Sequence, residues 1–269
     1  MDNQAKISAY KDFFNKRVRI DDYTGRLPDV LTSINESIPE WTEKLIIKSR
    51  ANDRAFFLDH GLTQEAFVQG YFNGVDMYFL VKYYSAARSV NPKQMEEKRL
   101  VEKILKDEKI AQPADLKDAS LATPEDANEL AQLYASIFKV YPTPLGDPAH
   151  VQKTFDEGTI YVLIRDNNKI VSAASAEINR QYSNAELTDC ATLPEVQGKG
   201  HIKKLLSKLE EVLRHKNIRC LYTIARAESY SMNKAFYQLN YKFGGLMINN
   251  CFIYSGLEDM NVWYKSTRA

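Results

Sequence analysis

The sequence predicts an α/β fold with a mixed central sheet, preceded by a second, N-terminal α/β region. Two observations predict it. From about residue 119 onward, strand-like and helix-like segments follow one another to the end of the chain. Within that series, a strand-like run ends at Pro194, and a turn with two glycines at residues 197–200 leads directly into an amphipathic helix. A strand, a tight turn and a helix in immediate succession are typical of α/β proteins.

Turn and capping signals locate the elements of the region 111–269. Thr123 and Asp147 each precede a proline, the pattern of a helix start. The polar turn 166–169 separates two β-rich runs and predicts a hairpin. We expect strands at 120–122, 159–165, 170–178, 185–193, 218–225, 246–254 and 260–265, and helices at 123–137, 147–155, 202–213 and 231–239.

The region 1–110 is set apart by a polar segment, 106–118, that reads as a linker. We expect strands at 13–23, 44–50 and 76–83, a helix around 55–58 and a second helical run at 67–71. Segments 45–50 and 76–85 resemble 221–226 and 259–266. This similarity indicates a weak internal repeat, and the alternative is a chance likeness between two strand–helix–strand units.

The composition limits the class of protein. At 269 residues the chain can form two modest domains, and 44% hydrophobic and 26% charged residues are typical of a globular protein. A net charge of +1 without a basic run argues against a nucleic-acid partner. No apolar run has the roughly 18 residues of a membrane span, and no signal peptide is evident. Three cysteines without metal-ligand spacing predict reduced core thiols, no metal and a cytoplasmic location.

The glycine turn predicts an anion site. Backbone N–H groups converge at the start of a helix, where the macrodipole is positive, and bind phosphate or pyrophosphate. Ile202, Leu205 and Leu209 lie on one apolar stripe of the helix, whereas Lys199 and Lys203 lie off it. The spacing fits neither a nucleotide P-loop nor a dinucleotide fingerprint. The alternative is an ordinary strand–turn–helix corner whose glycines serve geometry alone.

The turn resembles the Q/R-x-x-G-x-G/A signature of the GNAT acetyltransferases, with Gln197 and Gly200 at its first two positions and Ile202 where the family has Gly or Ala. The order of elements from 119 onward is also that of the GNAT fold. The resemblance implies acetyl-CoA as cofactor and two splayed parallel strands at 185–193 and 218–225. Together with the weak internal repeat, it indicates an N-terminal region that is a partial GNAT-like copy, with chance likeness as the alternative. It implies cofactor contacts from Cys190, Ala191, Thr192, Leu193, Gln197, Gly198, Lys199, Gly200, His201 and Ile202.

Acetyl transfer to an amine needs a base. Glu186 and Asp189 are the candidates, because a carboxylate within a strand of small and apolar residues is costly unless it has a role or a partner. On a regular strand the two would face opposite ways, and a bulge would bring them together. Glu177 is a third candidate. Salt bridges to Arg180 or Arg226 are the structural alternative.

The thiolate leaving group needs an acid. Segment 233–241 resembles the family's asparagine–tyrosine motif in compressed form, with Asn240 where glycine is usual. By resemblance, Tyr237 would be the acid and Asn233 a cofactor ligand. The alternatives are a tyrosine packed at a helix end and an asparagine that caps a helix.

A closer resemblance, to the beta-lysine N-acetyltransferases, covers nearly the whole chain. Segments 184–194, 243–250 and 256–265 carry it, together with 19–23, 52–58 and 69–74. It implies acetylation of the terminal amine of β-lysine, a step in making a compatible solute for osmoadaptation.

Such a substrate needs a basic group for its carboxylate and carboxylates for its free amine. The acceptor-side candidates are Asp21, Asp22, Tyr23, Glu177, Asn249 and Asn250, with Arg54, Arg180 and Arg226 as carboxylate partners. Three alternatives remain open: another small amine or a protein N-terminus as acceptor, a non-catalytic acyl-CoA-binding module, and a homodimer formed through the N-terminal region.

Overall fold

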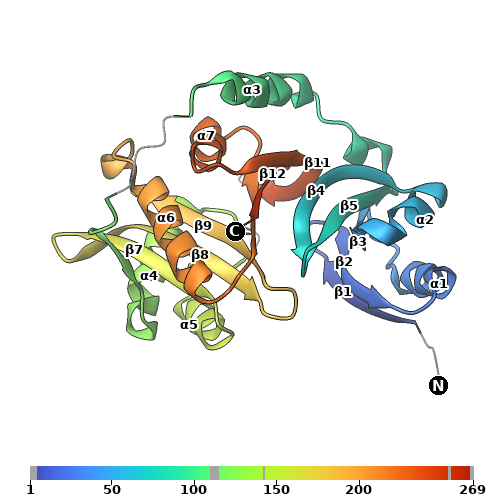
Figure 1. The fold of residues 1–269 in the computed structure, drawn as a ribbon, viewed down its shortest axis with the longest axis horizontal. Coiled ribbons are helices and arrows are strands. Elements are labelled where there is room, and N and C mark those ends of the chain that lie inside the picture. The colour runs from blue at the N-terminus through green and yellow to red at the C-terminus, as the bar shows by residue number, and fades with distance from the viewer. Residues whose placement is uncertain (1–4, 110–114, 142, 254–255, 267–269) are drawn as a thin grey trace.

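The computed structural model describes residues 5–109, 115–141, 143–253 and 256–266. They form a mixed α/β structure around one twelve-stranded sheet, which confirms the predicted fold class (Figure 1). The predicted domain boundary between residues 110 and 111 lies outside the described residues. No helix among the described residues is long and apolar enough to cross a membrane.

The N-terminal elements are β1 (Lys6–Asp12), β2 (Arg17–Thr24), α1 (Leu27–Ser37), β3 (Lys44–Arg50), α2 (Arg54–Asp59), β4 (Thr63–Phe72), β5 (Val75–Tyr83) and α3 (Gln94–Lys106). The C-terminal elements are β6 (Ala119–Leu121), α4 (Ala127–Ile137), α5 (Pro148–Asp156), β7 (Ile160–Asp166), β8 (Lys169–Asn179), β9 (Asn184–Thr192), α6 (His201–His215), β10 (Cys220–Arg226), α7 (Tyr230–Gln238), β11 (Lys242–Ile253) and β12 (Gly256–Ser266). The order predicted for the C-terminal half is confirmed.

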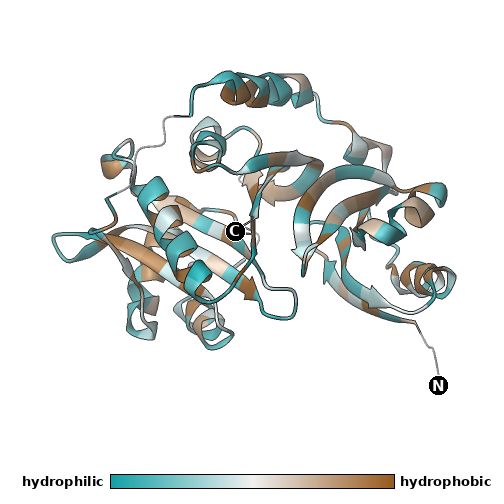
Figure 2. Ribbon diagram, in the orientation of Figure 1, coloured by the Kyte–Doolittle hydropathy of each residue, from teal (hydrophilic) through white to brown (hydrophobic). Residues whose placement is uncertain are grey.

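Two layers of helices cover the C-terminal strands (Figure 1). Helix α6 packs on one face, where Leu205, Leu209 and Leu213 are completely buried, as the predicted apolar stripe requires. Helices α4 and α5 pack on the opposite face, over Tyr161 and Leu163 of β7. Figure 2 shows the complementary pattern, with apolar residues concentrated in the strands and polar residues on the outer side of α6.

Two N-terminal expectations are wrong. The strand expected at 13–23 begins only at Arg17, because residues 13–16 form the turn between β1 and β2. Residues 67–71 were expected to be helical because Phe67 and Tyr71 lie four residues apart, but they belong to strand β4. In that strand Ala66 and Val68 are buried on one face, with register against β5. Pairing with β5 therefore overrides a local spacing that also fits a helix.

The sheet contains two units with the same topology. In the N-terminal unit (β1–β5 with α1 and α2), β2 is parallel to β3, and β3 and β4 flank β5 in antiparallel pairing. In the C-terminal unit (β8–β12 with α6 and α7), β9 is parallel to β10, and β10 and β11 flank β12 in the same way. The sheet order β1-β2-β3-β5-β4-β11-β12-β10-β9-β8 is thus nearly a mirror sequence about its centre.

The two units join at β4 and β11, where Gly245 pairs with Ala66. A Cβ atom added to Gly244 would lie 2.3 Å from the carbonyl oxygen of Phe67, and one added to Gly245 would lie 2.3 Å from that of Glu65. Only glycine permits this approach of the two backbones. The pair of glycines therefore makes one continuous sheet out of two units.

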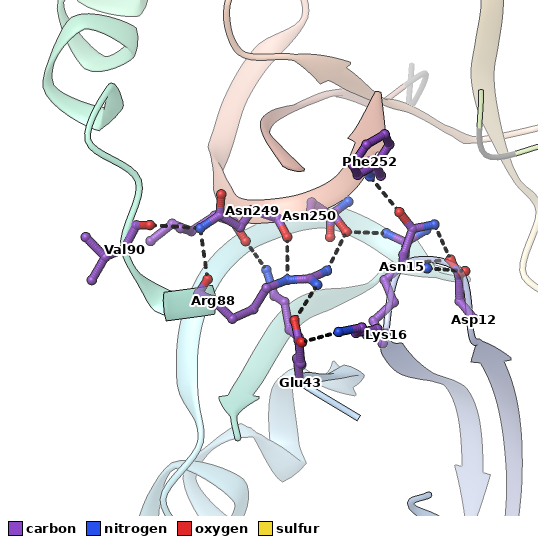
Figure 3. A network of polar contacts seen from close by, with 12 residues as sticks. Asp12, Asn15, Lys16, Glu43, Arg88, Val90, Asn249, Asn250 and Phe252 are labelled. Carbon is purple, nitrogen blue, oxygen red and sulfur yellow. Dashed lines mark hydrogen bonds and ion pairs between the residues drawn. The ribbon is translucent and has the colours of Figure 1, made fainter. Parts of the chain in front are cut away.

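Side chains of the N-terminal region also hold an irregular stretch of β11 (Figure 3). The register of β11 against β12 shifts between Met247 and Cys251. Two main-chain carbonyls in this stretch accept side-chain hydrogen bonds. The carbonyl of Asn249 accepts from Arg88 at 2.8 Å, and that of Asn250 accepts from Arg17 at 2.9 Å. These bonds satisfy carbonyls that the sheet itself leaves unpaired.

A buried ion pair completes the joint. Lys44 Nζ donates to Glu65 Oε2 at 2.7 Å and to the carbonyl oxygen of Ile248 at 2.7 Å. Burial lowers the pKa of Lys44 to about 8, although the carboxylate of Glu65 opposes the shift. The lysine thus links β3, β4 and β11 across the boundary between the units.

We predict that Gly244→Ala lowers the free energy of unfolding by about 1–3 kcal/mol, because the new methyl group has no space against the Phe67 carbonyl. Chemical denaturation measures this change. Gly256→Ala is the matched control, since a Cβ atom there meets nothing within 4 Å. Equal stability of the two variants would show that the close approach of β4 and β11 is not required.

Candidate functional site

A cavity of about 500 Å³ lies beside the part of β9 that no longer pairs with β10, and the turn after β9, the start of α6 and helix α7 form its other walls. The two strands pair in parallel only from Asn184 to Glu186 and from Cys220 to Tyr222, and both continue beyond that point. The expected divergence of these strands is therefore present. Of the predicted cofactor ligands, this splay cavity is lined by Cys190, Thr192, Gln197, Gly198, Gly200, His201 and Ile202.

The glycine turn shapes one wall of the splay cavity. Gly198 and Gly200 have φ values of +80° and +78°, and a Cβ atom at either would meet nothing within 4 Å. Backbone conformation, not space, requires glycine there. Gly200 is the N-cap of α6, so the free N–H groups of the first turn lie at this wall. Lys203 and His201 add side-chain donors, which makes the wall suited to an anion.

Three further predicted cofactor ligands are turned away from the splay cavity. The N–H of Leu193 donates to the carbonyl oxygen of Val171, and the carbonyl of Ala191 accepts from the hydroxyl of Ser172. The N–H of Leu193 and the carbonyl of Ala191 therefore face β8, and the carbonyl of Leu193 accepts from the N–H of Val196 within the turn. Lys199 is exposed beside the turn and is not part of the cavity wall.

Asn233 corrects another expectation. It is completely buried, and its Nδ2 donates to the carbonyl oxygens of Arg226 and Ser229 at 2.9 and 2.7 Å. Its Oδ1 accepts from Asn261 Nδ2 at 2.9 Å and from Trp263 Nε1 at 2.7 Å. The amide is thus fully engaged within the protein, which leaves it no group for a cofactor.

Tyr237 does not have the geometry of the predicted acid. Its hydroxyl lies 3.1 Å from the carbonyl oxygen of Leu105 and 3.0 Å from that of Asp107, and donates to them. Both carbonyls are at the end of α3, so the tyrosine ties α7 to the N-terminal region. It corresponds to the structural alternative, a tyrosine satisfied at a helix end.

Strand β9 contains a bulge, the feature that would bring Glu186 and Asp189 together. The register of β8 against β9 shifts between Ala173 and Ser175, and Asp189 has a φ of +51°. Glu186 and Asp189 consequently line the same cavity, of about 330 Å³, between the two units. Glu177 of β8 lies directly opposite Glu186 and lines this inter-unit cavity as well.

Two of the three carboxylates that line the inter-unit cavity, Glu177 and Asp189, have raised pKa values. Glu177 lies at the exposed rim of the cavity, where partial desolvation by the surrounding walls and the charges of Glu186 and Asp189 raise its pKa to about 7. Burial also raises the pKa of Asp189, against the effect of hydrogen bonds from Ser175 at 2.7 Å and Tyr141 at 3.1 Å. Among the described residues, no salt bridge reaches any of the three carboxylates. They form an acidic wall that is suited to an amine.

The N-terminal unit supplies a basic wall that sequence analysis missed. Arg19 binds Asp21 through Nε at 2.7 Å and Nη2 at 3.1 Å, and Lys48 Nζ lies 2.8 Å from the same carboxylate. Arg19 and Lys48 line the inter-unit cavity, and with Asp21 they line an adjoining one of about 420 Å³. The available signal was the presence of charged residues inside β-branched strands, where burial is costly without a role.

Of the remaining acceptor-side candidates, some line the cavities and others do not. Asp22 lines the adjoining cavity but pairs with Arg50 at 2.6 Å. The expectation for Tyr23 is wrong, because its ring packs in the core beneath α1 and α2, with Val30 and Phe57, and its hydroxyl donates to Asp53 at 2.8 Å. Asn250 lines the inter-unit cavity, and its buried Oδ1 has no hydrogen-bond partner within the described part of the chain.

The expectation for Asn249 is also wrong. Its Nδ2 donates to the carbonyl oxygens of Arg88 and Val90, at 3.1 and 2.9 Å, so the side chain secures the unit boundary (Figure 3). The three predicted carboxylate partners lie elsewhere. Arg226 binds Glu258 and Arg54 binds Gln64, while Arg180 is exposed after β8.

A family model and several known proteins are similar to this chain. Residues 127–241 match the model of the Acetyltransferase (GNAT) family. N-acetyltransferase YodP of Bacillus subtilis is 36% identical over 264 residues, 94% of this chain and 94% of that protein. Beta-lysine N(6)-acetyltransferase of Methanosarcina mazei is 34% identical over 226 residues, 76% of this chain and 83% of that protein. A GNAT superfamily phosphinothricin acetyltransferase from Sinorhizobium meliloti, solved with AcCoA, aligns at 22% identity and a TM-score of 0.49, over 55% of this chain and 88% of that one.

We predict that Asn233→Ala lowers the free energy of unfolding by about 2–4 kcal/mol, because the buried donors of Asn261 and Trp263 lose their acceptor and the carbonyls of Arg226 and Ser229 each lose one of two hydrogen bonds. Thermal or chemical denaturation tests this, with the exposed Asn52→Ala as control. A variant as stable as the control but with weakened cofactor affinity would restore the ligand role.

Proposed function

Because this chain belongs to the GNAT family of N-acetyltransferases, we propose that it transfers the acetyl group of acetyl-CoA to the terminal amine of β-lysine. The product would be Nε-acetyl-β-lysine, a compatible solute, which would give the protein a role in osmoadaptation. The acceptor assignment draws on the name of the Methanosarcina mazei relative and on the charges of the inter-unit cavity.

The splay cavity supports acetyl-CoA as the donor. Its size and its position beside the part of β9 that has left β10 suit a pantetheine arm, and the glycine turn with the first turn of α6 suits the pyrophosphate. The main chain at Cys190 and Thr192 borders the gap and would contact the arm and the thioester carbonyl. Burial raises the pKa of the Cys190 thiol to about 12, which favours direct transfer over an acetyl-cysteine intermediate.

The single observation that carries the acceptor assignment is the inter-unit cavity. Three carboxylates of the C-terminal unit line one side of this cavity, which has a volume of about 330 Å³, and Arg19 and Lys48 of the N-terminal unit line the other. β-Lysine has two amines and one carboxylate, so its charges match both walls. A protein N-terminus would need an open groove, whereas strands of the N-terminal unit wall this cavity through Arg19, Lys48 and Phe79.

The paired carboxylates supply the base. An amine attacks the thioester carbonyl only after the ammonium loses a proton, and we assign that proton to Glu177, which lies opposite Glu186. A carboxyl with a pKa of about 7 accepts a proton near neutral pH far better than an ordinary one. As the new C–N bond forms, the C–S bond breaks and the CoA thiolate leaves, to be protonated from solvent.

The direct test is turnover with a panel of amines. The protein is incubated with acetyl-CoA and β-lysine, α-lysine, polyamines or peptides with a free N-terminus, and thiol release is followed. We expect the highest kcat/KM with β-lysine. Strong turnover of another amine with none of β-lysine would overturn the acceptor assignment, and binding of acetyl-CoA without turnover of any amine would favour a non-catalytic module.

We predict that kcat/KM for β-lysine rises with pH through about 7, because Glu177 must be deprotonated to act as a base. Glu177→Gln should lose this limb of the profile and about 10²–10⁴-fold in rate. The exposed Glu157→Gln, which removes a carboxylate from the end of α5, is the control. A Glu177→Gln profile that keeps the limb near pH 7 would assign the base to another group.

A further inference from the structure

We propose that Arg19 and Lys48 form a binding site for the acceptor's carboxylate, so that the N-terminal unit restricts the enzyme to amino acids with a distant second amine. This inference rests on the proposed acetyltransferase function and concerns the residues that select its substrate. Three observations support it: the charge balance of the basic wall, the relation between the two units, and the absence of a donor turn in the N-terminal unit.

The basic wall carries more positive charge than its partner neutralises. Arg19 and Lys48 share the single carboxylate of Asp21. Lys48 is nine-tenths buried and has one further bond, to the hydroxyl of Tyr71 at 3.1 Å. Within the described residues, Nη1 of Arg19 has no hydrogen-bond acceptor. Lys48 is buried, whereas the side chains of Arg19 and Asp21 are partly exposed toward the cavity. Two cations that share one carboxylate and keep a free donor at the cavity wall are suited to bind a second carboxylate.

Asp21 also fixes the direction of the two cations. It receives two bonds from the guanidinium of Arg19 and one ion pair from Lys48. These two cations lower the pKa of Asp21 although burial opposes the shift, so the carboxylate stays charged. The side chains are therefore held in place before a ligand arrives, which reduces the entropy lost on binding.

The repeated topology places the basic and acidic walls opposite one another. Arg19 is the third residue of β2 and pairs with the third residue of β3, Ile46. Glu186 is the third residue of β9 and pairs with the third residue of β10, Tyr222. Equivalent positions of the two units thus line one cavity with opposite charges. An amino acid placed between them can direct its carboxylate to one unit and its amine to the other.

The N-terminal unit has no counterpart of the glycine turn. Residues 193–200 separate β9 from α6, whereas only residues 25–26 separate β2 from α1. Helix α1 begins with Pro28 in its first turn, which removes one of the N–H groups an anion would use. This unit therefore retains the strands that face the acceptor and lacks the turn suited to the donor.

The test uses a pair of acceptors that differ only in the carboxylate. 1,4-Diaminopentane is β-lysine without its carboxyl group and retains both amines. For the wild-type protein we expect kcat/KM to be at least about tenfold higher with β-lysine, because the diamine leaves the basic wall unpaired. Equal kcat/KM for the two acceptors would overturn the proposal. No turnover of either would instead contradict the proposed function.

Substitutions then locate the selectivity. Because both cations also lower the pKa of Glu177, the variants are compared well above pH 7, where Glu177 is deprotonated. There Arg19→Gln and Lys48→Gln should each raise KM for β-lysine about tenfold or more, with kcat little changed, and leave kcat/KM for 1,4-diaminopentane within about twofold. Arg19→Lys should recover part of the loss, since it keeps the charge without the fork. Arg26→Gln, which removes an exposed arginine at the start of α1, is the control.

Parallel losses with both acceptors in Arg19→Gln and Lys48→Gln would show that these residues only support the structure, and would overturn the proposal. Thermal unfolding of each variant identifies those that fail to fold. If Arg19→Gln is among them, the wild-type comparison of the two acceptors and the Lys48→Gln variant still decide.

Discussion

The close approach of β11 to β4 is the constraint on which the rest of the structure depends. Gly244 and Gly245 allow the backbones to meet where a Cβ atom would lie 2.3 Å from a carbonyl oxygen. That contact joins two units of the same topology into one sheet and brings β2 and β3 toward β8 and β9. Without it, the C-terminal unit would keep the splay cavity but lose one wall of the inter-unit cavity.

The chemistry follows from what each unit contributes. The C-terminal unit provides the diverging strands, the glycine turn and the acidic wall with its bulge at Asp189. The N-terminal unit provides the basic wall and, through Arg88 and Lys44, holds the irregular stretch of β11. Charges that are costly to bury singly are acceptable here because they face one another across a small cavity that a substrate with the same charge pattern can fill.

Local signals in the sequence predict the C-terminal fold and the glycine turn. Capping residues mark the helix starts, and two closely spaced glycines mark the turn. A carboxylate within an apolar strand drew attention to the place where the structure has its bulge. The roles of Tyr237, Asn233 and Asn249 could not be predicted from sequence. Their hydrogen-bond partners come from α3, β12 and residues 88–90, which only the tertiary structure brings near. Arg19 and Lys48 were missed for the same reason, since their place opposite Glu186 depends on the joint between the units.

The most direct test of the central claim, that the acceptor site is shared between the two units, is a crystal structure with CoA and β-lysine bound. The account predicts pyrophosphate at the turn of Gly198 and Gly200, and the β-lysine carboxylate within hydrogen-bond distance of Arg19 and Lys48. Its terminal amine should lie toward Glu177 and the bulge at Asp189. β-Lysine bound through residues of the C-terminal unit alone, with Arg19 and Lys48 uninvolved, would contradict the account.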